Sequence, residues 1–530
     1  MTKTTFRQLF LAFLVLGLGV RLAYLDLRPM HHDEANQAVK FGTLLETGKY
    51  QYDPNDHHGP TLYYLTLPAA WARGQNNLAA LDEWTLRVVP AVFGAGLILL
   101  LSPLATGLGR GAIALGALFA ALSPALTYYS RFYIQESLFA FFALGFLLAL
   151  GRYALRPTAG RALAAGVFAG FTFATKETSI IVLAAAIAAV LLEQIWASGV
   201  ISRRRGFSGP SLAVVIQILA GTAAAVSVAT VLFSSFFQNS DGIFDSVRAF
   251  QDYAVRGIAE PGLHAHPWYF YLRTLAFSRS GGIVWTEGMI LLLAVAGMLE
   301  ALAGNRRKED SDGLEPAATT VDIFWLRYIA IYSLISAAAF SILRYKTPWN
   351  LIPFYVGFVI LAGCGATALL RRIPSRLFRG AAVIILLAGI CHLAFQNWQA
   401  NFVYPADPRN PYVYAQTSPD FLRLVQRVHD LRAVHADKDD MLIKVIAGPY
   451  EQWPLPWYLR DLRRVGYWAE PAAAGATEGV PVIIASQEYA GELQVALGDR
   501  VQAEFYGLRP DVLLAVFVER SLWERYLQTR

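Results

Sequence analysis

Two histidines and two acids stand side by side at His31-His32-Asp33-Glu34, directly after the first apolar segment of the chain. Two carboxylates at close range raise the pKa of one of them, which gives a base that works near neutral pH. A structural interpretation competes with this one, because an Asp before an apolar-periodic run, here EANQAVKFGTLLE, commonly caps a helix. The residues alone leave both interpretations of Asp33 open.

Other histidines also lie in polar segments, His57 and His58 in DPNDHHGPT and His264 and His266 in LHAHPWYFYLR. Together with His31, His32 and Asp33 they could hold zinc or another divalent ion. None of the pairs has the i, i+4 spacing of a helical metal site. Hydrogen bonds from loop histidines to carboxylates and substrate hydroxyls are therefore the favoured interpretation, and a divalent metal ion stays open as a cofactor.

Three cations occupy very short turns between apolar segments: Arg131 shortly before Glu136, Lys176 in TKET, and Lys346 in KTPWN. Charges at the membrane face are costly unless they are paired or bind something, so these residues are candidates for function. The competing interpretation is interfacial anchoring, in which Lys and Arg reach the lipid headgroups and Trp349 joins an aromatic belt.

Aromatic residues are plentiful near the same segments, and their faces can stack on sugars. An aromatic belt has the same composition and is the favoured interpretation for most of them. The stretch YEQWPLPWY, with Trp453 and Trp457, differs because it lies in the polar C-terminal part. A belt role there requires that part to dock on the membrane, where it would shape the choice of acceptor.

The composition predicts an integral membrane protein. Hydrophobic residues make up 55% of the 530, charged residues only 16%, and the mean hydropathy is +0.40. Soluble domains carry about 25% charged residues. The two cysteines, Cys364 and Cys391, both lie in apolar runs, so a disulfide framework is not expected.

Eleven apolar stretches approach the roughly 20 residues needed to cross a bilayer. The first is interpreted as an uncleaved helix, because no small-residue cleavage site follows it. The predicted spans are 6–26, 86–106, 112–130, 136–151, 162–175, 178–196, 211–236, 283–303, 323–343, 349–370 and 380–398.

Lys and Arg of the short loops all fall on one side of this eleven-span arrangement, which must be the cytoplasm. We therefore expect a multi-pass protein of the inner or plasma membrane with a cytoplasmic N-terminus and an extracytoplasmic C-terminal part. The basic residues behind the net charge of +6 set the orientation of the chain in the membrane, so a nucleic-acid partner is not expected. The basic positions are Lys3, Arg7, Arg110, Arg152, Arg156, Arg161, Arg203–Arg205, Arg306–Lys308, Arg371, Arg372, Arg376 and Arg379.

Two domains are predicted. Residues 1–399 form a helical transmembrane domain with long outer loops at 27–85 and 237–282. Residues 400–530 form a soluble α/β domain, which opens on an irregular Pro- and Tyr-rich stretch. It continues with a helix at 418–435 and strands in MLIKVIAG, GVPVIIAS and LLAVFVE. The absence of GxGxxG, P-loop, CxxC and HExxH motifs argues against nucleotide-driven pumping and the commonest metalloproteases.

The order of these motifs resembles the C-type (GT-C) membrane glycosyltransferases that use polyprenyl-phosphate sugar donors, closest to the protein O-mannosyltransferase and aminoarabinose transferase group. An Asp-Glu pair after the first span matches Asp33-Glu34, and an HPPL-like element matches His58-Gly59-Pro60-Thr61-Leu62, although Gly59 replaces the usual first Pro. The motifs HHDEA, DHHGPTLYY, TKET, KTPWN and WPLPWYLR further resemble a prokaryotic branch, the flippase activity-associated protein family. The resemblance covers about residues 20 to 460.

The resemblance implies an inverting transfer in which Asp33 is the general base and Glu34 orients it or helps to bind acceptor or metal. Lys346 is the first choice for binding the donor phosphate, followed by Arg131 and Lys176, and the acceptor is a protein, glycan or lipid. The remaining residues expected to contact substrate are His32, His57, His58, Glu136, His266, Trp349, Trp453 and Trp457.

Two other functions compete with this one. A non-enzymatic partner could bind lipid-linked sugars during their flipping, with the same residues forming the binding cavity. A secondary transporter would use the charges near the membrane as an ion path. Its paired, broken helices in two inverted halves are not visible in the sequence, so the enzyme is the preferred function and the non-enzymatic partner the alternative.

Overall fold

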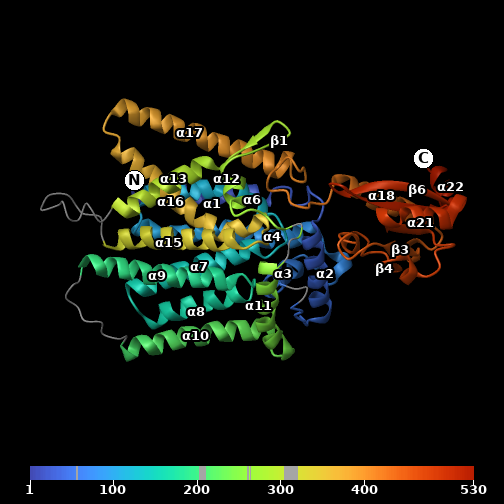
Figure 1. Cartoon of the computed structure of the whole chain (residues 1–530), viewed down its shortest axis with the longest axis horizontal. Helices are drawn as coiled ribbons and strands as arrows, with labels where there is room; N and C mark the ends of the chain where they lie inside the picture. Colours follow the sequence, from blue (N-terminus) through green and yellow to red (C-terminus); the bar gives the residue numbers. More distant parts are fainter. Residues whose placement is uncertain (55–57, 202–210, 260–261, 263, 304–319) are drawn as a thin grey trace. The chain divides into compact units, whose positions relative to one another are not determined.

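The computed structural model describes residues 1–54, 58–201, 211–259, 262, 264–303 and 320–530 (Figure 1). The chain divides into two compact units, each built from segments distant in the sequence. The first, which we call the membrane unit, comprises Met1–Ala23, Lys49–Leu65 and Arg87–Val403. The second, which we call the sheet unit, comprises Tyr24–Gly48, Thr66–Leu86 and Tyr404–Arg530.

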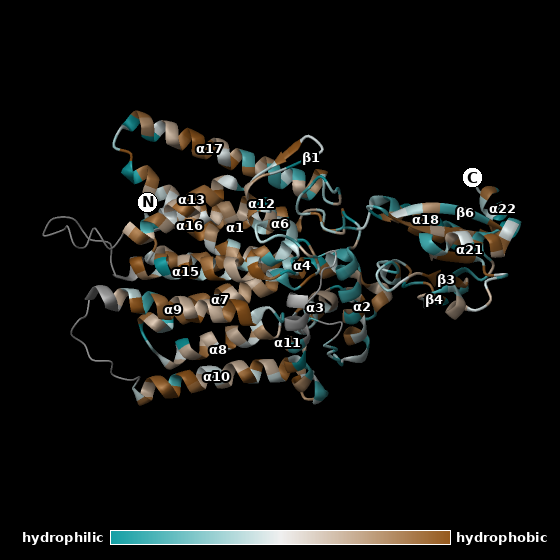
Figure 2. Ribbon diagram, viewed as in Figure 1, coloured by the Kyte–Doolittle hydropathy of each residue, from teal (hydrophilic) through white to brown (hydrophobic). Residues whose placement is uncertain are grey.

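The membrane unit is a bundle of long apolar helices that run alongside one another in Figure 1. Hydrophobic residues dominate these helices (Figure 2), and many on α10 and α17 are exposed, as expected of surfaces that face lipid. Its long helices are α1 (Lys3–Leu22), α4 (Glu83–Leu101), α5 (Arg110–Leu122), α7 (Glu136–Leu155), α8 (Ala159–Phe173), α9 (Ser179–Ile201), α10 (Leu212–Phe233), α13 (Gly288–Ala303), α15 (Thr320–Ile342), α16 (Ile352–Arg372) and α17 (Arg376–Trp398).

Each of the eleven predicted spans overlaps a helix of this bundle, although 112–130 covers two helices and 283–303 begins in a β-strand. Within the described residues, eight helices are long and apolar enough to cross a membrane, and a ninth span results if the bent pair α5 and α6 (Pro124–Ser130) counts as one. Helices α8 and α13 are apolar but shorter. A multi-pass membrane protein is thus confirmed, whereas the count of eleven stays a prediction.

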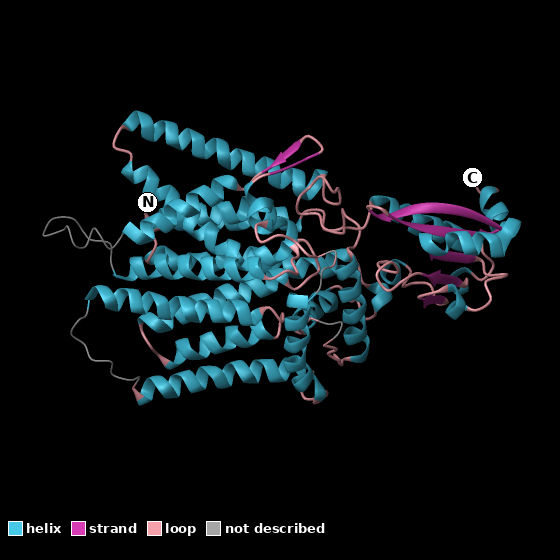
Figure 3. Cartoon of the chain, in the orientation of Figure 1, coloured by secondary structure: helices cyan, strands magenta, loops and turns pink. Residues whose placement is uncertain are grey.

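Shorter elements connect the long helices. Between α10 and α13 lie α11 (Asp241–Ala259), α12 (Phe270–Ala276) and a hairpin of β1 (Ser278–Ser280) and β2 (Ile283–Trp285), drawn in magenta in Figure 3. A 3-10 turn, η3 (Pro348–Leu351), leads into α16, and a π-helical turn at Gln399–Val403 follows α17.

The sheet unit contains a mixed five-stranded sheet of order β4-β3-β5-β7-β6. Strand β3 pairs parallel with β4 and β5, whereas β7 pairs antiparallel with β5 and β6. The strands are β3 (Ile443–Ile446), β4 (Val465–Trp468), β5 (Val482–Ser486), β6 (Val501–Arg509) and β7 (Val512–Glu519). The predicted strands correspond to β3, β5 and β7, so the α/β character is confirmed.

Alternating strand residues give the sheet two apolar faces. One face, including Val445 and Val516, packs against α18 (Pro419–Val434) and α22 (Arg520–Leu527). The other, including Ile483 and Phe517, packs against α21 (Gln487–Leu497). Burial on both faces explains why β5 is apolar along nearly its whole length.

Three early helical segments complete the chain. Helix α2 (His32–Thr47) belongs to the sheet unit, as does the short turn η1 (Leu78–Ala80). Helix α3 (Thr61–Ala72) begins in the membrane unit and ends in the sheet unit. The segment that contains the acids Asp33 and Glu34 is therefore packed with the C-terminal part of the chain.

Candidate active site

The N-terminus of α2 is built by a capping box that uses His31 and Glu34. The His31 ring nitrogen Nδ1 accepts the backbone N–H of Asp33 at 3.0 Å, and Glu34 Oε2 accepts the backbone N–H of His31 at 3.0 Å. His31 is thus the N-cap, in the role that Ser or Thr usually plays. Asp33 is not the cap that the structural interpretation required.

The two neighbouring acids have different environments. The Glu34 side chain is completely buried, and Arg28 lies 3.9 Å from its Oε1 atom. The Asp33 side chain is 40% exposed and sits in the first turn of α2, where backbone N–H groups favour an ionised carboxylate. Glu34 therefore stabilises the fold locally, and Asp33 is the acid of the pair that a substrate can reach.

Segments from the C-terminal part of the sheet unit hold the residues that precede α2. The Tyr458 hydroxyl accepts the backbone N–H of Met30 at 2.9 Å, and His31 Nε2 lies 3.0 Å from the Tyr414 carbonyl oxygen. Gln416 Nε2 donates to the Pro29 carbonyl at 2.9 Å. These bonds fix the backbone next to Asp33 although their partners are 383 to 428 residues away in sequence.

The aromatic residues predicted to contact substrate differ in burial. Trp453 is half-buried, and its ring lies 6.0 Å from the His32 ring. Trp457 is fully buried; its indole N–H donates to Glu83 at 2.9 Å, and the Arg460 guanidinium lies over its ring at 3.8 Å. Trp457 therefore packs inside the unit, whereas Trp453 stays accessible.

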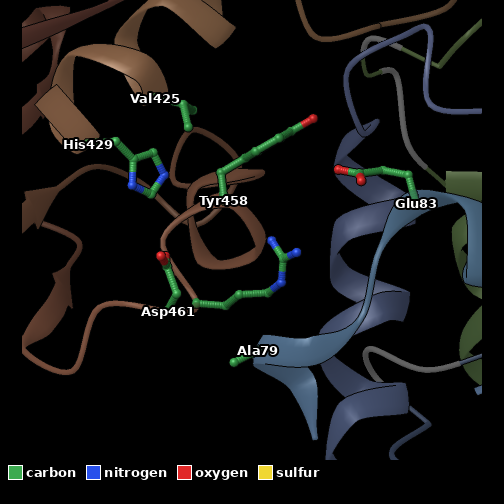
Figure 4. Close-up of a pocket in the computed structure, with 7 residues that line it drawn as sticks. Ala79, Glu83, Val425, His429, Tyr458 and Asp461 are labelled. Atoms are coloured by element: carbon green, nitrogen blue, oxygen red, sulfur yellow. The ribbon is translucent and has the colours of Figure 1, made fainter. Parts of the chain in front are cut away.

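A pocket of about 320 Å³ lies beside Trp457 in the same unit. Figure 4 shows its lining, in which the Tyr458 side chain extends toward Glu83 and His429 projects from α18. Burial lowers the pKa of Arg460, which also lines it. The pocket is lined by Ala79, Glu83, Val425, His429, Tyr458, Arg460 and Asp461. No sequence motif predicted it.

In the membrane unit, Lys346 is almost completely buried, with 1% of the residue exposed. Its ammonium group donates to the carbonyl oxygens of His266, at 3.0 Å, and Leu343. Among the described residues no carboxylate lies within 4.0 Å of it, so its positive charge is not neutralised. Burial lowers the pKa of Lys346, which an anionic ligand would raise again.

The segment 264–266 is paired with the turn that carries Lys346. The Lys346 backbone N–H donates to His264 at 2.9 Å, and Ala265 forms a β-bridge with Tyr345. The His266 ring stacks on Phe270, and burial lowers its pKa. Trp349 is buried in η3 against Tyr129. Residues 264–266 and the KTPWN turn are thus paired, which no pattern in the sequence predicted.

Arg131 caps the end of α1. Its guanidinium donates to the carbonyl oxygens of Val20, Arg21 and Ala23, and it lies 4.8 Å above the Phe402 ring. A cation at a helix C-terminus is stabilised by the unpaired carbonyls there. This structural role makes Arg131 a weaker candidate than Lys346 for binding phosphate.

Lys176 forms a buried ion pair with Glu136 and also donates to Asn350 Oδ1 at 2.9 Å. The pair joins the TKET turn to α7 and to the KTPWN turn. Both members were predicted to contact substrate separately, and their mutual pairing was missed because 40 residues separate them. Lys176 is consequently neutralised by the protein itself.

His58 is hydrogen-bonded to an acid in the membrane unit. Its Nδ1 atom lies 2.8 Å from Glu177 Oε2, and the Tyr52 hydroxyl donates to Glu177 Oε1 at 3.3 Å. Glu177 is buried, whereas 28% of the His58 side chain is exposed. Glu177 therefore orients an accessible imidazole, and it was named in the sequence only as part of TKET.

Gly59 explains the departure from the HPPL-like pattern. A Cβ atom there would lie 2.5 Å from the carbonyl carbon of Ala174 and even closer to its oxygen. That same oxygen accepts the backbone N–H and the hydroxyl of Thr61, at 3.2 and 2.7 Å. Only glycine permits this close approach of the HGPT segment to the TKET turn.

The histidines do not assemble a metal site in the part of the chain that the structure describes, where no group of three or more His, Cys, Asp or Glu side chains could hold an ion. His57 lies outside the described residues. The predicted catalytic acids belong to the sheet unit, and the three predicted cations belong to the membrane unit.

Comparison with known proteins gives a family match for part of the chain. Residues 67–222 match the family model described as dolichyl-phosphate-mannose-protein mannosyltransferase. A comparison of the sequence with curated proteins finds no match.

Solved structures match almost the whole chain. ArnT from Cupriavidus metallidurans bound to undecaprenyl phosphate has a TM-score of 0.58 at 16% identity, covering 98% of this chain and 99% of that one. The archaeal oligosaccharyltransferase AglB from Archaeoglobus fulgidus, in complex with an inhibitory peptide and a dolichol-phosphate, has a TM-score of 0.56 at 13% identity, covering 97% and 77%.

The S. cerevisiae protein O-mannosyltransferase Pmt1-Pmt2 complex bound to the sugar donor has a TM-score of 0.56 at 10% identity, covering 81% of this chain and 92% of that one. The resemblance to C-type membrane glycosyltransferases is confirmed by these matches of fold and by the family match. The flippase-associated branch stays a prediction.

Proposed function

We propose that this chain, which has the fold of the polyprenyl-phosphate-dependent membrane glycosyltransferases, transfers a sugar from such a lipid donor to an acceptor. The transfer takes place on the extracytoplasmic side and inverts the anomeric configuration. The distribution of Lys and Arg among the short loops supports this side of the membrane.

Asp33 is the general base of this proposal. The observation that carries it is the contrast between the two acids: the Glu34 side chain is buried in the capping box, whereas 40% of the Asp33 side chain is exposed. An accessible carboxylate can accept a proton from an acceptor bound beside it. The capping box fixes the backbone that carries it.

In the proposed reaction, the acceptor oxygen or nitrogen forms a bond to the anomeric carbon while the bond from that carbon to the phosphate oxygen breaks. The proton of the acceptor passes to Asp33. The bonding electron pair leaves with the phosphate, so the lipid phosphodiester becomes a phosphomonoester with one more negative charge. This added charge is what the protein must stabilise, because the leaving group needs no strong acid.

Lys346 provides that stabilisation in the proposal. Its ammonium is bound by backbone carbonyls rather than by a carboxylate, so its charge is available to a phosphate. The low dielectric around a buried cation strengthens such an interaction. His58, oriented by Glu177, is a second candidate for phosphate contact. Arg131 and Lys176 have structural roles in the proposal, because Arg131 caps α1 and Lys176 is paired with Glu136.

The proposal is tested with the purified full-length chain in lipid nanodiscs, incubated with radiolabelled polyprenyl-phosphate sugars and candidate acceptors. We expect labelled product whose anomeric configuration is opposite to that of the donor. Retained configuration would contradict direct displacement, and tight lipid binding without transfer to any acceptor would favour the non-enzymatic alternative.

A matched pair of lysine variants tests the phosphate ligand. Lys444 in the sheet unit also donates to two backbone carbonyls, those of Ala474 and Ala476, at 2.6 and 2.8 Å. Lys346→Ala is expected to raise the KM for the donor at least tenfold, and Lys444→Ala to leave it unchanged. Equal effects of the two variants would remove Lys346 from the proposed site.

A further inference from the structure

Three aromatic rings gather beside Asp33 in the sheet unit. The His32 ring lies 6.1 Å from the Tyr450 ring, nearly parallel to it, and 6.0 Å from the Trp453 ring. His32 begins α2, and the other two rings come from the loop that follows β3. We call these three residues the aromatic cluster.

The aromatic cluster has polar atoms that the protein does not use. The Tyr450 residue is 76% exposed, and Trp453 is half-buried. Within the described residues, neither the Tyr450 hydroxyl nor the Trp453 indole N–H has a hydrogen-bond partner. An exposed aromatic surface whose hydrogen-bonding groups bond to no protein atom is typical of ligand sites.

The loop that carries Tyr450 is held in place rather than free. Arg509 donates to the Tyr450 carbonyl oxygen at 3.0 Å, and the His32 ring also hydrogen-bonds to the Tyr450 backbone. Further along the same segment, Tyr458 accepts the backbone N–H of Met30. The rings are thus positioned before any ligand binds, which lowers the entropy cost of binding.

The charges around the aromatic cluster indicate a neutral ligand. The Arg509 guanidinium lowers the pKa of His32, whereas the Asp33 carboxylate raises it. The Glu451 carboxylate in turn interacts with Arg509. Burial lowers the pKa of His32, which favours the uncharged imidazole. An anionic ligand would find no net positive charge here, whereas hydroxyl groups could both donate to and accept from the free polar atoms.

We propose that the aromatic cluster of His32, Tyr450 and Trp453 binds a neutral pyranose ring of the acceptor, so that the acceptor is a carbohydrate. The C–H groups on one face of a pyranose carry partial positive charge and pack on the negative face of an aromatic ring. The hydroxyls at the edge of the sugar bind the free phenol and indole groups. This inference rests on the proposed function, because Asp33 adjoins His32 and would take the acceptor's proton.

Binding is tested first without catalysis. Saturation-transfer NMR is performed on the full-length chain in nanodiscs, with methyl α-D-mannopyranoside, methyl β-D-glucopyranoside and a serine-containing peptide as probes. We expect at least one glycoside to bind, and to lose its signal in Tyr450→Ala/Trp453→Ala. Binding of the peptide alone, or loss of glycoside binding in His429→Ala, which alters the 320 Å³ pocket instead, would overturn the inference.

Kinetics then separate this inference from the proposed function. For an acceptor that is turned over, Tyr450→Ala and Trp453→Ala are expected to raise the acceptor KM about tenfold, with kcat and donor KM within twofold. Trp453→Phe should restore part of the affinity because it keeps a ring. Phe505→Ala, which removes another exposed aromatic ring of the sheet unit, on β6 (56% exposed), is the control and should have no effect.

Each outcome has a separate meaning. Transfer by the wild type with an unchanged acceptor KM in both alanine variants would refute the aromatic cluster but leave the glycosyltransferase intact. Loss of donor affinity in those variants would indicate that the rings contact the lipid phase instead. Absence of transfer by the wild type, with glycoside binding that depends on the cluster, would refute only the enzymatic proposal.

Discussion

The change Gly59→Ala tests how the HGPT segment is held against the TKET turn. The added Cβ would lie 2.5 Å from the Ala174 carbonyl carbon, about 1 Å inside ordinary van der Waals contact. The obstacle is backbone, so no side-chain rotation relieves it. The segment must therefore move away, and both hydrogen bonds of Thr61 to the Ala174 oxygen lengthen.

The size of the effect follows from these contacts. Two hydrogen bonds contribute about 1 kcal/mol each, and overpacking of a tight contact costs about 1–3 kcal/mol. We expect Gly59→Ala to destabilise the protein by about 3–5 kcal/mol. The same movement shifts the adjacent His58 away from Glu177, so the donor KM should rise as well.

Thermal unfolding of the purified protein in detergent measures the change. Gly160→Ala at the start of α8 is the matched control, because nothing lies within 4 Å of its Cβ position and alanine favours a helix. Its melting temperature should equal or slightly exceed that of the wild type, whereas that of Gly59→Ala should fall by several degrees. Equal melting temperatures for Gly59→Ala and the wild type would refute this account of the motif.

Glu136→Gln removes the carboxylate that pairs with the buried Lys176 ammonium, so the free energy of unfolding should fall by about 3–5 kcal/mol. The exchange Glu136→Lys/Lys176→Glu should restore part of this loss. An unchanged free energy of unfolding in the single variant would contradict the ion pair. Because burial lowers the pKa of Lys346, its ammonium is lost as pH rises through a value below the ordinary 10.5. The donor KM of the wild type should therefore increase at alkaline pH, and that of Lys346→Arg should not; parallel pH profiles would argue against this role. To test the topology, single cysteines are introduced at the exposed positions Thr43 and Gly160. An impermeant reagent added from outside should label the first cysteine and not the second. Identical labelling of the two would contradict the predicted orientation.

The sequence predicted the apolar helices and three strands well, because each depends on a local pattern, either a long apolar stretch or a short β-branched run. It could not predict that 24–48 and 66–86 pack with 404–530, since those contacts join segments far apart in the chain. The strands β4 and β6 were missed because they are less apolar than β3, β5 and β7.

At the candidate site, the sequence predicted which residues matter more successfully than which residues hydrogen-bond or pair with one another. The sequence indicated a helix after Asp33 but not that His31 would cap it, because histidine is an unusual N-cap. It also treated Lys176 and Glu136 as separate ligands, although each neutralises the other. Such pairings depend on which helices lie side by side, and a single sequence does not contain that information.

The measurement closest to the central proposal is the single-turnover rate of Asp33→Asn with bound donor and saturating acceptor. Asn keeps the shape of the side chain but cannot take a proton, so we expect the rate to fall by about 10²–10⁴. Since His31 caps α2, the variant should fold and bind donor normally. Asp26→Asn, which alters an exposed acid seven residues earlier, is the control and should retain its rate. A rate for Asp33→Asn within threefold of the wild type would contradict the assignment of Asp33 as the base.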